Sequence, residues 1–289
     1  LDAGEQAQKY AIAGANIISV LTEPRWFKGG LDDMTSVRLQ TTGQSYQRPA
    51  VLRKEFTTSK YQITEAIAKG ADTILLIVAV LPQHLLKELI DHARSLGMEP
   101  LVEVHADSEL EVALQAGAKV IGVNNRNLHT FQMDLQTTEH VAEILTKQGC
   151  VFDHNDPNSE YTICSLSGMS TAFDVDRYRK INVGMCLIGE SLMRAADPKA
   201  AIAGLCLDPA AFASSTSFSG GAYTAGTKIV KICGVTNAED AKVACQAGAN
   251  LIGVIFVSKS KRCVTPEQAK EVVESVRTFG ERTKRLQIP

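Results

Sequence analysis

The chain has 289 residues, with 30 Lys and Arg against 32 Asp and Glu, a formal net charge of −2, and 45% hydrophobic residues. This composition excludes a disordered chain, which combines few apolar residues with a large net charge. It also argues against nucleic-acid binding, which needs a basic face, and against a membrane segment, because the longest apolar run covers only residues 74–81.

The cysteine pattern indicates the cellular compartment, and the start of the chain indicates that it is part of a longer polypeptide. Seven cysteines are scattered singly, without a C-x-x-C pair, so we expect neither disulfides nor a metal site, and a reducing, cytoplasmic compartment. The chain begins at Leu1 and shows no signal pattern. We therefore expect an internal part of a longer polypeptide, with an upstream domain as a candidate partner.

A helix is predicted over residues 4–13, followed by a glycine and a β-branched run. The same order of helix, glycine and apolar run recurs along the chain, with the glycine and run at residues 14–20, 70–78, 117–123, 184–189 and 248–254. Glycine suits the left-handed residue that closes a helix. A continuous apolar run indicates a strand covered on both faces of a parallel sheet.

Further short strands are predicted between these copies, at residues 51–53, 101–104 and 162–164. Strand and helix alternate about seven times up to Leu205, which predicts an α/β fold with right-handed crossovers. Units of such regular size favour a (β/α)8 TIM barrel, although the repeat alone leaves an open doubly wound sheet as an alternative. Because only seven strands precede Leu205, the barrel is expected to lack its first strand and to expose two strand edges.

The composition changes after this region. Residues 208–227 are rich in Ala, Ser, Thr and Gly, which predicts a flexible linker. A new series follows, with a strand at residues 229–232, a helix at 237–247, a strand at 251–256 and a helix starting at Thr265. These are the first two βα units of a second barrel, so the predicted domains are residues 1–207, the linker 208–227 and the partial barrel 228–289.

Polar residues gather at predicted carboxyl ends of strands, where parallel βα folds bind ligands. Lys54 ends one strand, Glu103 lies inside an apolar strand, and Asn124 ends the next, with Arg126 two residues on. Lys54 also belongs to a charged cluster typical of a solvated surface, and Asn124 equally fits a turn cap. Glu103 is the strongest candidate, since a carboxylate in an apolar strand is costly unless paired.

Small residues follow the last two strands, Ser167 and Gly168 and then Gly189 and Glu190. They fit plain turns, and they also fit a phosphate held by backbone N–H groups. Together, these strand ends offer an amine, a carboxylate and an amide, which can exchange protons and orient a ligand. They also offer a guanidinium and backbone N–H groups, which can hold a phosphate. The six histidines show no ligand spacing and are expected on the surface.

At these residues the sequence resembles the indole-3-glycerol phosphate synthase family. The matching stretches run in family order, at residues 16–23, 49–56, 70–78, 97–104, 121–128 and 187–194. Residues 230–241 and 258–262 resemble the start of the phosphoribosylanthranilate isomerase family, an order similar to multifunctional tryptophan-pathway proteins. Both families are TIM barrels.

The resemblance implies a reaction and its participants. The reaction is the decarboxylating ring closure of 1-(2-carboxyphenylamino)-1-deoxyribulose 5-phosphate to indole-3-glycerol phosphate, without a cofactor. The expected partner is therefore a phosphorylated small molecule, with no nucleic acid or membrane.

The resemblance also implies roles for single residues. Lys54 matches the general acid of ring closure, Glu103 the carboxylate of the later dehydration, and Asn124 a substrate-orienting residue. Arg126 matches a phosphate contact, and Cys233 matches the general base of the isomerase. The other matches are substrate-binding residues, namely Phe27 and Phe56 as apolar walls around the aryl ring, and Ser167, Gly168, Gly189 and Glu190 in loops.

Two departures from the family pattern lower the expected activity. No motif like E-x-K-x-x-S-P-S of the family's first strand occurs, and Leu166 stands where many members have Glu. We expect residues 1–289 alone to be weakly active or inactive, and the isomerase half to be inactive because the acidic partner of Cys233 would lie beyond Pro289. Two alternatives stay open: another lysine-dependent phosphate-binding barrel enzyme, such as an aldolase, and a non-catalytic fragment that binds a phosphorylated ligand or a partner domain.

Overall fold

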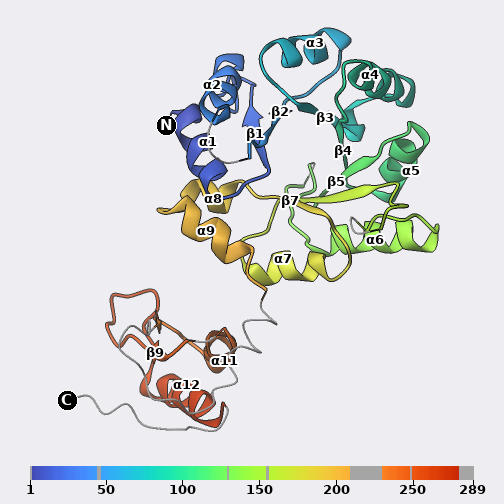
Figure 1. Ribbon diagram of the computed structural model, residues 1–289. Helices are drawn as coiled ribbons and strands as arrows, with labels where there is room; N and C mark the ends of the chain where they lie inside the picture. Colours follow the sequence, from blue (N-terminus) through green and yellow to red (C-terminus); the bar gives the residue numbers. More distant parts are fainter. Residues whose placement is uncertain are drawn as a thin grey trace. The chain divides into compact units, whose positions relative to one another are not determined.

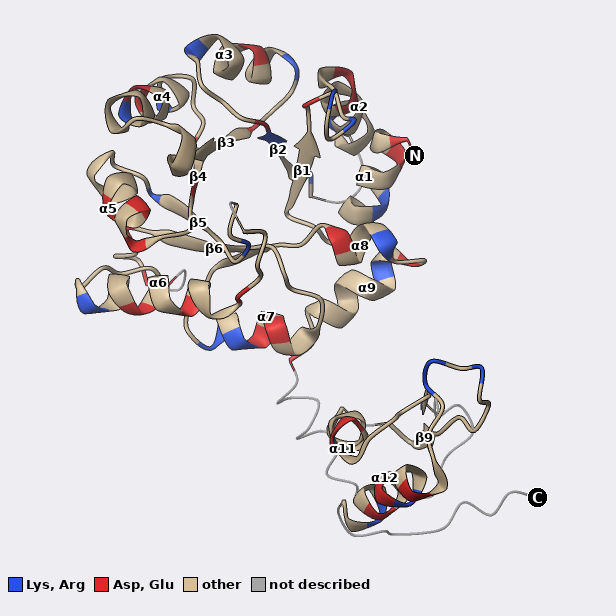
Figure 2. Ribbon diagram, turned by 180° about the vertical axis from the view of Figure 1, so that it is seen from behind, with Lys and Arg blue, Asp and Glu red and all other residues tan. Residues whose placement is uncertain are grey.

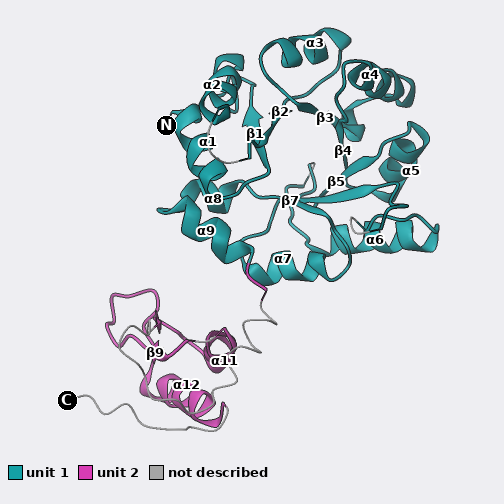
Figure 3. Ribbon diagram, in the orientation of Figure 1, with its two compact units in different colours: residues 1–206 teal, residues 207–289 magenta. Residues whose placement is uncertain are grey.

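The computed structural model describes residues 2–43, 47–128, 130–153, 156–208, 230–247 and 249–279. The chain divides into two compact units, Leu1–Cys206 and Leu207–Pro289 (Figure 3). The predicted linker lies outside the described residues, apart from Asp208. Within the described part of the chain, no helix has the length and apolar character needed to cross a membrane.

The first unit is built around seven parallel strands that pair in chain order (Figure 1). The strands are β1 Ile17–Leu21, β2 Ala50–Lys54, β3 Thr73–Ile77, β4 Leu101–Val104, β5 Val120–Asn124, β6 Thr162–Leu166 and β7 Met185–Leu187. They form a nearly closed barrel with β1 and β7 as its edges. The predicted seven-stranded TIM-type barrel is confirmed, and the doubly wound alternative is wrong, because in that fold the strand order reverses.

Helices surround the strands, namely α1 Ala3–Ile12, α2 Leu31–Thr41, α3 Lys60–Ala68, α4 Gln83–Ser95, α5 Asp107–Gln115, α6 Gln136–Lys147, α7 Ala172–Arg179, α8 Glu190–Arg194 and α9 Pro198–Leu205. As expected, Gly14, Gly70 and Gly117 have left-handed φ values of 95°, 100° and 86° after the helices that they close. Gly184 was expected to close α7 in the same left-handed conformation, and this expectation is wrong. Asn182, with φ 60°, takes this conformation instead.

The alternation of side chains along each strand creates two apolar layers. Residues such as Val51, Val102 and Ile121 face outward and belong to the core beneath the helices. Residues on the other face fill the barrel, among them Leu52 and Leu101. Lys54 and Glu103 follow these last two by two positions, so they share the inner face at the carboxyl ends of the strands. Most charged residues instead lie on the helices and loops (Figure 2).

The second unit contains β8 Lys231–Cys233, α11 Ala238–Gln246, β9 Leu251–Gly253 and α12 Pro266–Thr278. The two strands pair in parallel, and the small core includes Val235, Ala241 and Val272. The two predicted βα units are therefore present. The strand predicted over residues 251–256 ends earlier, at Gly253, and Ile255 makes only an isolated bridge to Cys263.

Candidate active site

Lys54 ends β2 on the inner face of the barrel, while its two charged neighbours are held elsewhere. Arg53 is buried, donates to Thr22 Oγ1 at 3.1 Å and pairs with Glu65 at 3.0 Å. Thr22 in turn donates to Glu55 Oε2 at 3.1 Å. The charged cluster seen in the sequence is therefore a fixed network around Lys54 rather than a uniformly solvated surface.

Glu103 and Asn124 form the buried polar part of the site. Glu103 is only 3% exposed, and its Oε1 accepts a hydrogen bond from Asn124 Nδ2 at 2.8 Å. Asn124 Oδ1 accepts from the backbone N–H of Arg126 at 3.0 Å, so both ends of the amide are engaged. Glu103 Oε2 has no hydrogen-bond partner among the described residues. One buried carboxylate oxygen of a pocket-lining residue is thus left without a partner among the described residues.

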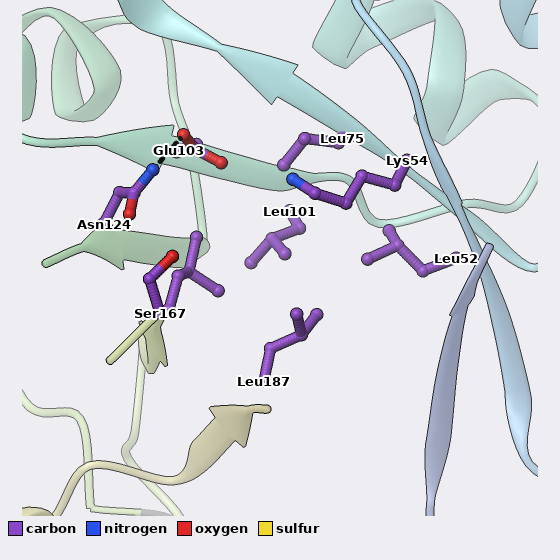
Figure 4. A pocket seen from close by; sticks show the side chains of 9 residues that line it. Leu52, Lys54, Leu75, Leu101, Glu103, Asn124, Ser167 and Leu187 are labelled. Atoms are coloured by element: carbon purple, nitrogen blue, oxygen red, sulfur yellow. Dashed lines mark hydrogen bonds between the residues drawn. The ribbon is translucent and has the colours of Figure 1, made fainter. Parts of the chain in front are cut away.

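A pocket at the carboxyl ends of the strands brings together Lys54, Glu103, Asn124 and Ser167 (Figure 4). The Lys54 side chain extends toward Glu103, and the rest of the wall is apolar, formed by Leu52, Leu75, Leu101, Leu166 and Leu187. The cavity measures about 50 Å³, which has room for a few water molecules. Apolar walls lower the local dielectric, so charges here act more strongly on a ligand than they would in water.

The chain turns sharply after β6. Ser167 and Gly168 are both left-handed, with φ values of 67° and 86°, which is uncommon for a residue other than glycine. Leu166 lies inside the barrel over Gly122, where an added Cβ would come within 2.9 Å of Leu166 Cδ1. The absence of a side chain on Gly122 therefore makes room for Leu166 in the pocket wall.

Asn125 supports this turn and was not identified by the sequence analysis. Its side chain is fully buried, and Nδ2 lies 3.1 Å from Ser165 Oγ, the Ser167 carbonyl oxygen and Tyr178 Oη, which share its two N–H donors. Its Oδ1 accepts from Thr138 Oγ1 at 2.8 Å. The partners come from β6, α6 and α7, so no local signal in the sequence reveals this network.

Arg126, Gly189 and Glu190 lie outside the lining of the Lys54 pocket. Arg126 Nη2 is 3.9 Å from Glu190 Oε2, which brings the chain after β5 close to the start of α8. Glu190 also pairs with Arg194 at 2.9 Å. Gly189 precedes α8, and an added Cβ there would meet nothing within 4 Å. These residues form a polar surface at the same ends of the strands.

Phe27 and Phe56 lie on the loops after β1 and β2 and are 51% and 45% exposed. Neither lines the pocket, and their predicted contact with an aryl ring stays a prediction. The surface expectation is wrong for His105, which is half-buried with Nδ1 2.7 Å from the Asn124 carbonyl oxygen. Because a carbonyl only accepts, this nitrogen carries the proton. His105 and Glu103 also line a second, smaller pocket.

In the second unit, Cys233 is exposed at the end of β8. Arg262 donates from Nη1 to the Cys233 carbonyl at 3.1 Å, and its guanidinium lies against Gly234. Arg262 was not among the site residues predicted from the sequence. Within the part of the chain that the structure describes, no group of three or more His, Cys, Asp and Glu is arranged to hold a metal ion.

An amine, a carboxylate and an amide lie together at the carboxyl ends of parallel strands, where TIM-barrel enzymes have their active sites. Residues 1–205 match the family model of indole-3-glycerol phosphate synthase, and residues 230–280 match that of N-(5'-phosphoribosyl)anthranilate isomerase. The chain belongs to the indole-3-glycerol phosphate synthase family, with an isomerase-type module after it.

The relatives include proteins named as multifunctional and proteins named for the synthase alone. The chain is 46% identical over 275 residues to a multifunctional tryptophan biosynthesis protein of Phanerodontia chrysosporium, covering 95% of this chain and 33% of that protein. It is 41% identical over 196 residues to an indole-3-glycerol phosphate synthase of Sulfurimonas denitrificans, covering 68% of each. The chain spans 33% to 51% of the length of the tryptophan biosynthesis proteins that it matches.

Solved structures share the architecture at much lower identity. 3-Hexulose-6-phosphate synthase from Salmonella typhimurium superposes with a TM-score of 0.51 at 14% identity, covering 68% of this chain and 88% of that one. A likeness at this identity shows the fold alone.

Proposed function

We propose that the barrel of residues 1–207 is a carbon–carbon lyase that closes the indole ring of indole-3-glycerol phosphate. Its substrate would be 1-(2-carboxyphenylamino)-1-deoxyribulose 5-phosphate, and the products would include carbon dioxide and water. The observation that carries this proposal is the shared pocket of Lys54 and Glu103, with one Glu103 oxygen unpartnered among the described residues. Family membership supplies the reaction.

The roles follow from what each side chain presents to the pocket. Lys54, a donor on the inner face, protonates the substrate carbonyl oxygen as the new carbon–carbon bond forms and the carboxylate leaves as carbon dioxide. Glu103 then takes a proton from the neighbouring carbon and gives a proton to the resulting hydroxyl, which leaves as water. Asn124 fixes the Glu103 carboxylate and orients the substrate. These steps use side chains alone and no cofactor.

The remaining predicted residues hold the rest of the substrate. Arg126 donates to the phosphate, with the loops of Ser167, Gly168, Gly189 and Glu190 around it. Glu190 lies near Arg126 in the free protein, so phosphate would compete with this carboxylate for the guanidinium. Phe27 and Phe56 provide the apolar wall for the aryl ring.

A single-turnover assay tests the lyase proposal. Excess protein is mixed with the substrate, and indole fluorescence of the product is followed, because weak turnover is expected from residues 1–289. We expect product from the wild type and from Lys87→Met, an exposed lysine on α4, but a strong loss in Lys54→Met. Equal rates in all three proteins would overturn the proposal, whereas no product from any of them would agree with the expected inactivity of residues 1–289 and would favour the non-catalytic alternative.

Two additional readouts separate the alternatives. Borohydride trapping of a carbonyl substrate on Lys54 would indicate an aldolase-type Schiff base. Thermal stabilisation by the substrate without any product would indicate a non-catalytic phosphate-ligand-binding fragment.

We also propose an isomerase function for the second unit, and a partner and a location for the chain. Residues 228–289 would begin the isomerase barrel, with Cys233 as its general base, joined to the synthase barrel through the linker at residues 208–227. An upstream domain of the same polypeptide is a proposed partner. All seven cysteines are free, which supports a cytoplasmic location.

A further inference from the structure

The loop after β1 is held by the carboxylate of Glu23. This carboxylate accepts hydrogen bonds from the backbone N–H groups of three successive residues, Arg25 at 2.9 Å, Trp26 at 2.6 Å and Phe27 at 3.0 Å. Charge-assisted bonds of this kind are shorter and stronger than neutral ones. One side chain therefore fixes the backbone that carries two aromatic rings.

The other end of the same loop is closed by Gly29. Its backbone N–H donates to the Glu23 carbonyl at 3.2 Å, and Lys28 before it has a left-handed φ of 60°. An added Cβ on Gly29 would overlap the Leu21 carbonyl oxygen, so only glycine allows the loop to fold back this closely. Residues 23–29 thus form a compact loop, fixed at its first and last residues.

This loop presents exposed aromatic rings after the carboxyl end of β1, the strand that pairs with the lysine-bearing β2. Trp26 is 73% and Phe27 is 51% exposed, and the Arg25 guanidinium lies 4.9 Å from the Trp26 ring centroid. The loop begins where β1 pairs with the lysine-bearing strand, because Leu21 aligns with Lys54. The two rings are therefore adjacent, exposed and carried by a fixed backbone, so they can contact a ligand bound at this end of the strands.

The protonation state of Glu23 fits this arrangement. Partial desolvation raises the pKa of the Glu23 carboxyl, but the backbone hydrogen bonds from Trp26, Phe27 and Arg25 lower it, and the net direction is downward. The carboxylate is therefore charged at neutral pH, which is the form that accepts all three bonds.

We propose that Glu23 is a positioning residue that holds Trp26 and Phe27 as a preformed aromatic wall for the aryl ring of the substrate. This inference rests on the proposed function and adds Trp26 to its binding site. A wall fixed before binding loses little conformational freedom when the ligand arrives, so the affinity of ring-bearing ligands depends on Glu23. Ligands that have the phosphate but no ring do not depend on it.

Two probes distinguish binding that depends on the aryl ring from binding that depends on the phosphate alone. The first is 1-(2-carboxyphenylamino)-1-deoxyribitol 5-phosphate, in which the carbonyl is reduced so that ring closure is blocked. The second is ribose 5-phosphate, which lacks the ring. Calorimetric dissociation constants of both are measured for residues 1–289. We expect Glu23→Ala and Trp26→Leu to weaken binding of the first probe roughly tenfold and to leave the second unchanged.

Control variants separate positioning from general destabilisation. Asp197 accepts backbone N–H bonds from Lys199 and Ala200 at the start of α9, so Asp197→Ala removes a comparable exposed acceptor away from this loop. We expect it to change neither dissociation constant. Glu23→Gln, which keeps one neutral acceptor, is expected to fall between Glu23→Ala and the wild type.

Trp26 is the only tryptophan in the chain, so its fluorescence reports the contact directly. Binding of the ring-bearing probe should protect Trp26 from acrylamide quenching, whereas ribose 5-phosphate should not. Equal weakening of both probes in Glu23→Ala, or no weakening of either, would overturn the inference while leaving the lyase proposal intact. If the wild type bound neither probe, the proposed function would fail and the inference with it.

Discussion

Glu103 accepts a hydrogen bond from Asn124 across neighbouring strands, at 2.8 Å, while its second oxygen has no partner among the described residues. In the β4–β5 register Glu103 aligns with Gly122, so Asn124 lies two positions further on the same face. Burying an unpaired carboxylate oxygen is unfavourable for stability. A catalytic site can retain such an arrangement because the oxygen is then free to exchange a proton with substrate.

The first prediction concerns the charge on Glu103. Glu103→Gln keeps the size of the side chain and a carbonyl oxygen for Asn124, but it removes the proton-exchanging group. We expect the single-turnover rate to fall by roughly 10²- to 10⁴-fold, with thermal stability unchanged or increased because a buried charge is lost. The matched control is Glu88→Gln, an exposed partner of Lys60, which should change neither quantity. A rate close to that of the wild type would contradict the assigned role.

The second prediction concerns Asn125. Asn125→Ala removes the partner of several fully buried groups, including Ser165 Oγ, Thr138 Oγ1 and Tyr178 Oη. Tyr178 Oη keeps its bond to the Leu135 carbonyl, and the two hydroxyls keep their bond to each other. The loss of several buried hydrogen bonds is still costly, so we expect the free energy of unfolding to fall by about 2 kcal/mol, measured by urea denaturation. Asn158→Ala, in an exposed loop, should have little effect. A loss below about 1 kcal/mol would show that the network is not required for stability.

The comparison of Asn124 with Asn125 shows what the sequence can predict. The barrel, its strand positions and the inward face of Lys54 and Glu103 follow from repeats and from the alternation of side chains along strands. Asn124 was identified by its place at a strand end. The role of Asn125 depends on partners 13 to 53 residues away, as the separations of its hydrogen bonds show, and no local pattern encodes these.

The same limit applies around Lys54. The sequence shows Arg53, Lys54 and Glu55 as three adjacent charges, equally consistent with a solvated surface. Strand alternation predicts that Lys54 faces the other way from its neighbours. The buried contacts of Arg53 with Thr22 and Glu65, however, depend on how β1 and α3 pack against β2, which only the structure reveals.

The third prediction concerns alkaline stability. Burial raises the pKa of the Cys186 thiol to about 11, and burial raises the pKa of the Cys164 thiol still further. An unfolded thiol ionises near pH 8.5, so the stabilising effect is complete below that pH and is lost as the pH rises above it. We expect the free energy of unfolding to fall between pH 7.5 and pH 9.5, by about 1 kcal/mol for each buried thiol.

Cysteine variants test whether the buried thiols cause this fall in the free energy of unfolding at alkaline pH. Cys164→Ala should reduce the difference in unfolding free energy between the two pH values, whatever its effect at either pH alone, because alanine does not ionise. Cys263→Ser, at an exposed position in the second unit, should leave the difference unchanged. An unaltered difference in Cys164→Ala would assign the alkaline loss to other groups.

The fourth prediction concerns the response of the Glu23 loop to acid. The folded state lowers the pKa of Glu23, so the loop contacts are stabilising above the pKa of an unfolded glutamate, about 4.3, and are lost as pH falls through the lower folded value. We expect the fluorescence anisotropy of Trp26 to drop in this acid range, while far-UV circular dichroism shows whether the barrel is still folded. Glu23→Gln should abolish this transition, since glutamine does not titrate.

Glu267 provides the matched control for this acid transition. Its pKa is also lowered, by a backbone hydrogen bond and by the side chain of Thr265 at the start of α12. Glu267→Gln changes a carboxylate of similar character in the second unit, so the Trp26 transition should persist in that variant. If the transition were identical in wild type, Glu23→Gln and Glu267→Gln, the loop would owe its order to Gly29 and its contact with Leu21 rather than to the Glu23 carboxylate.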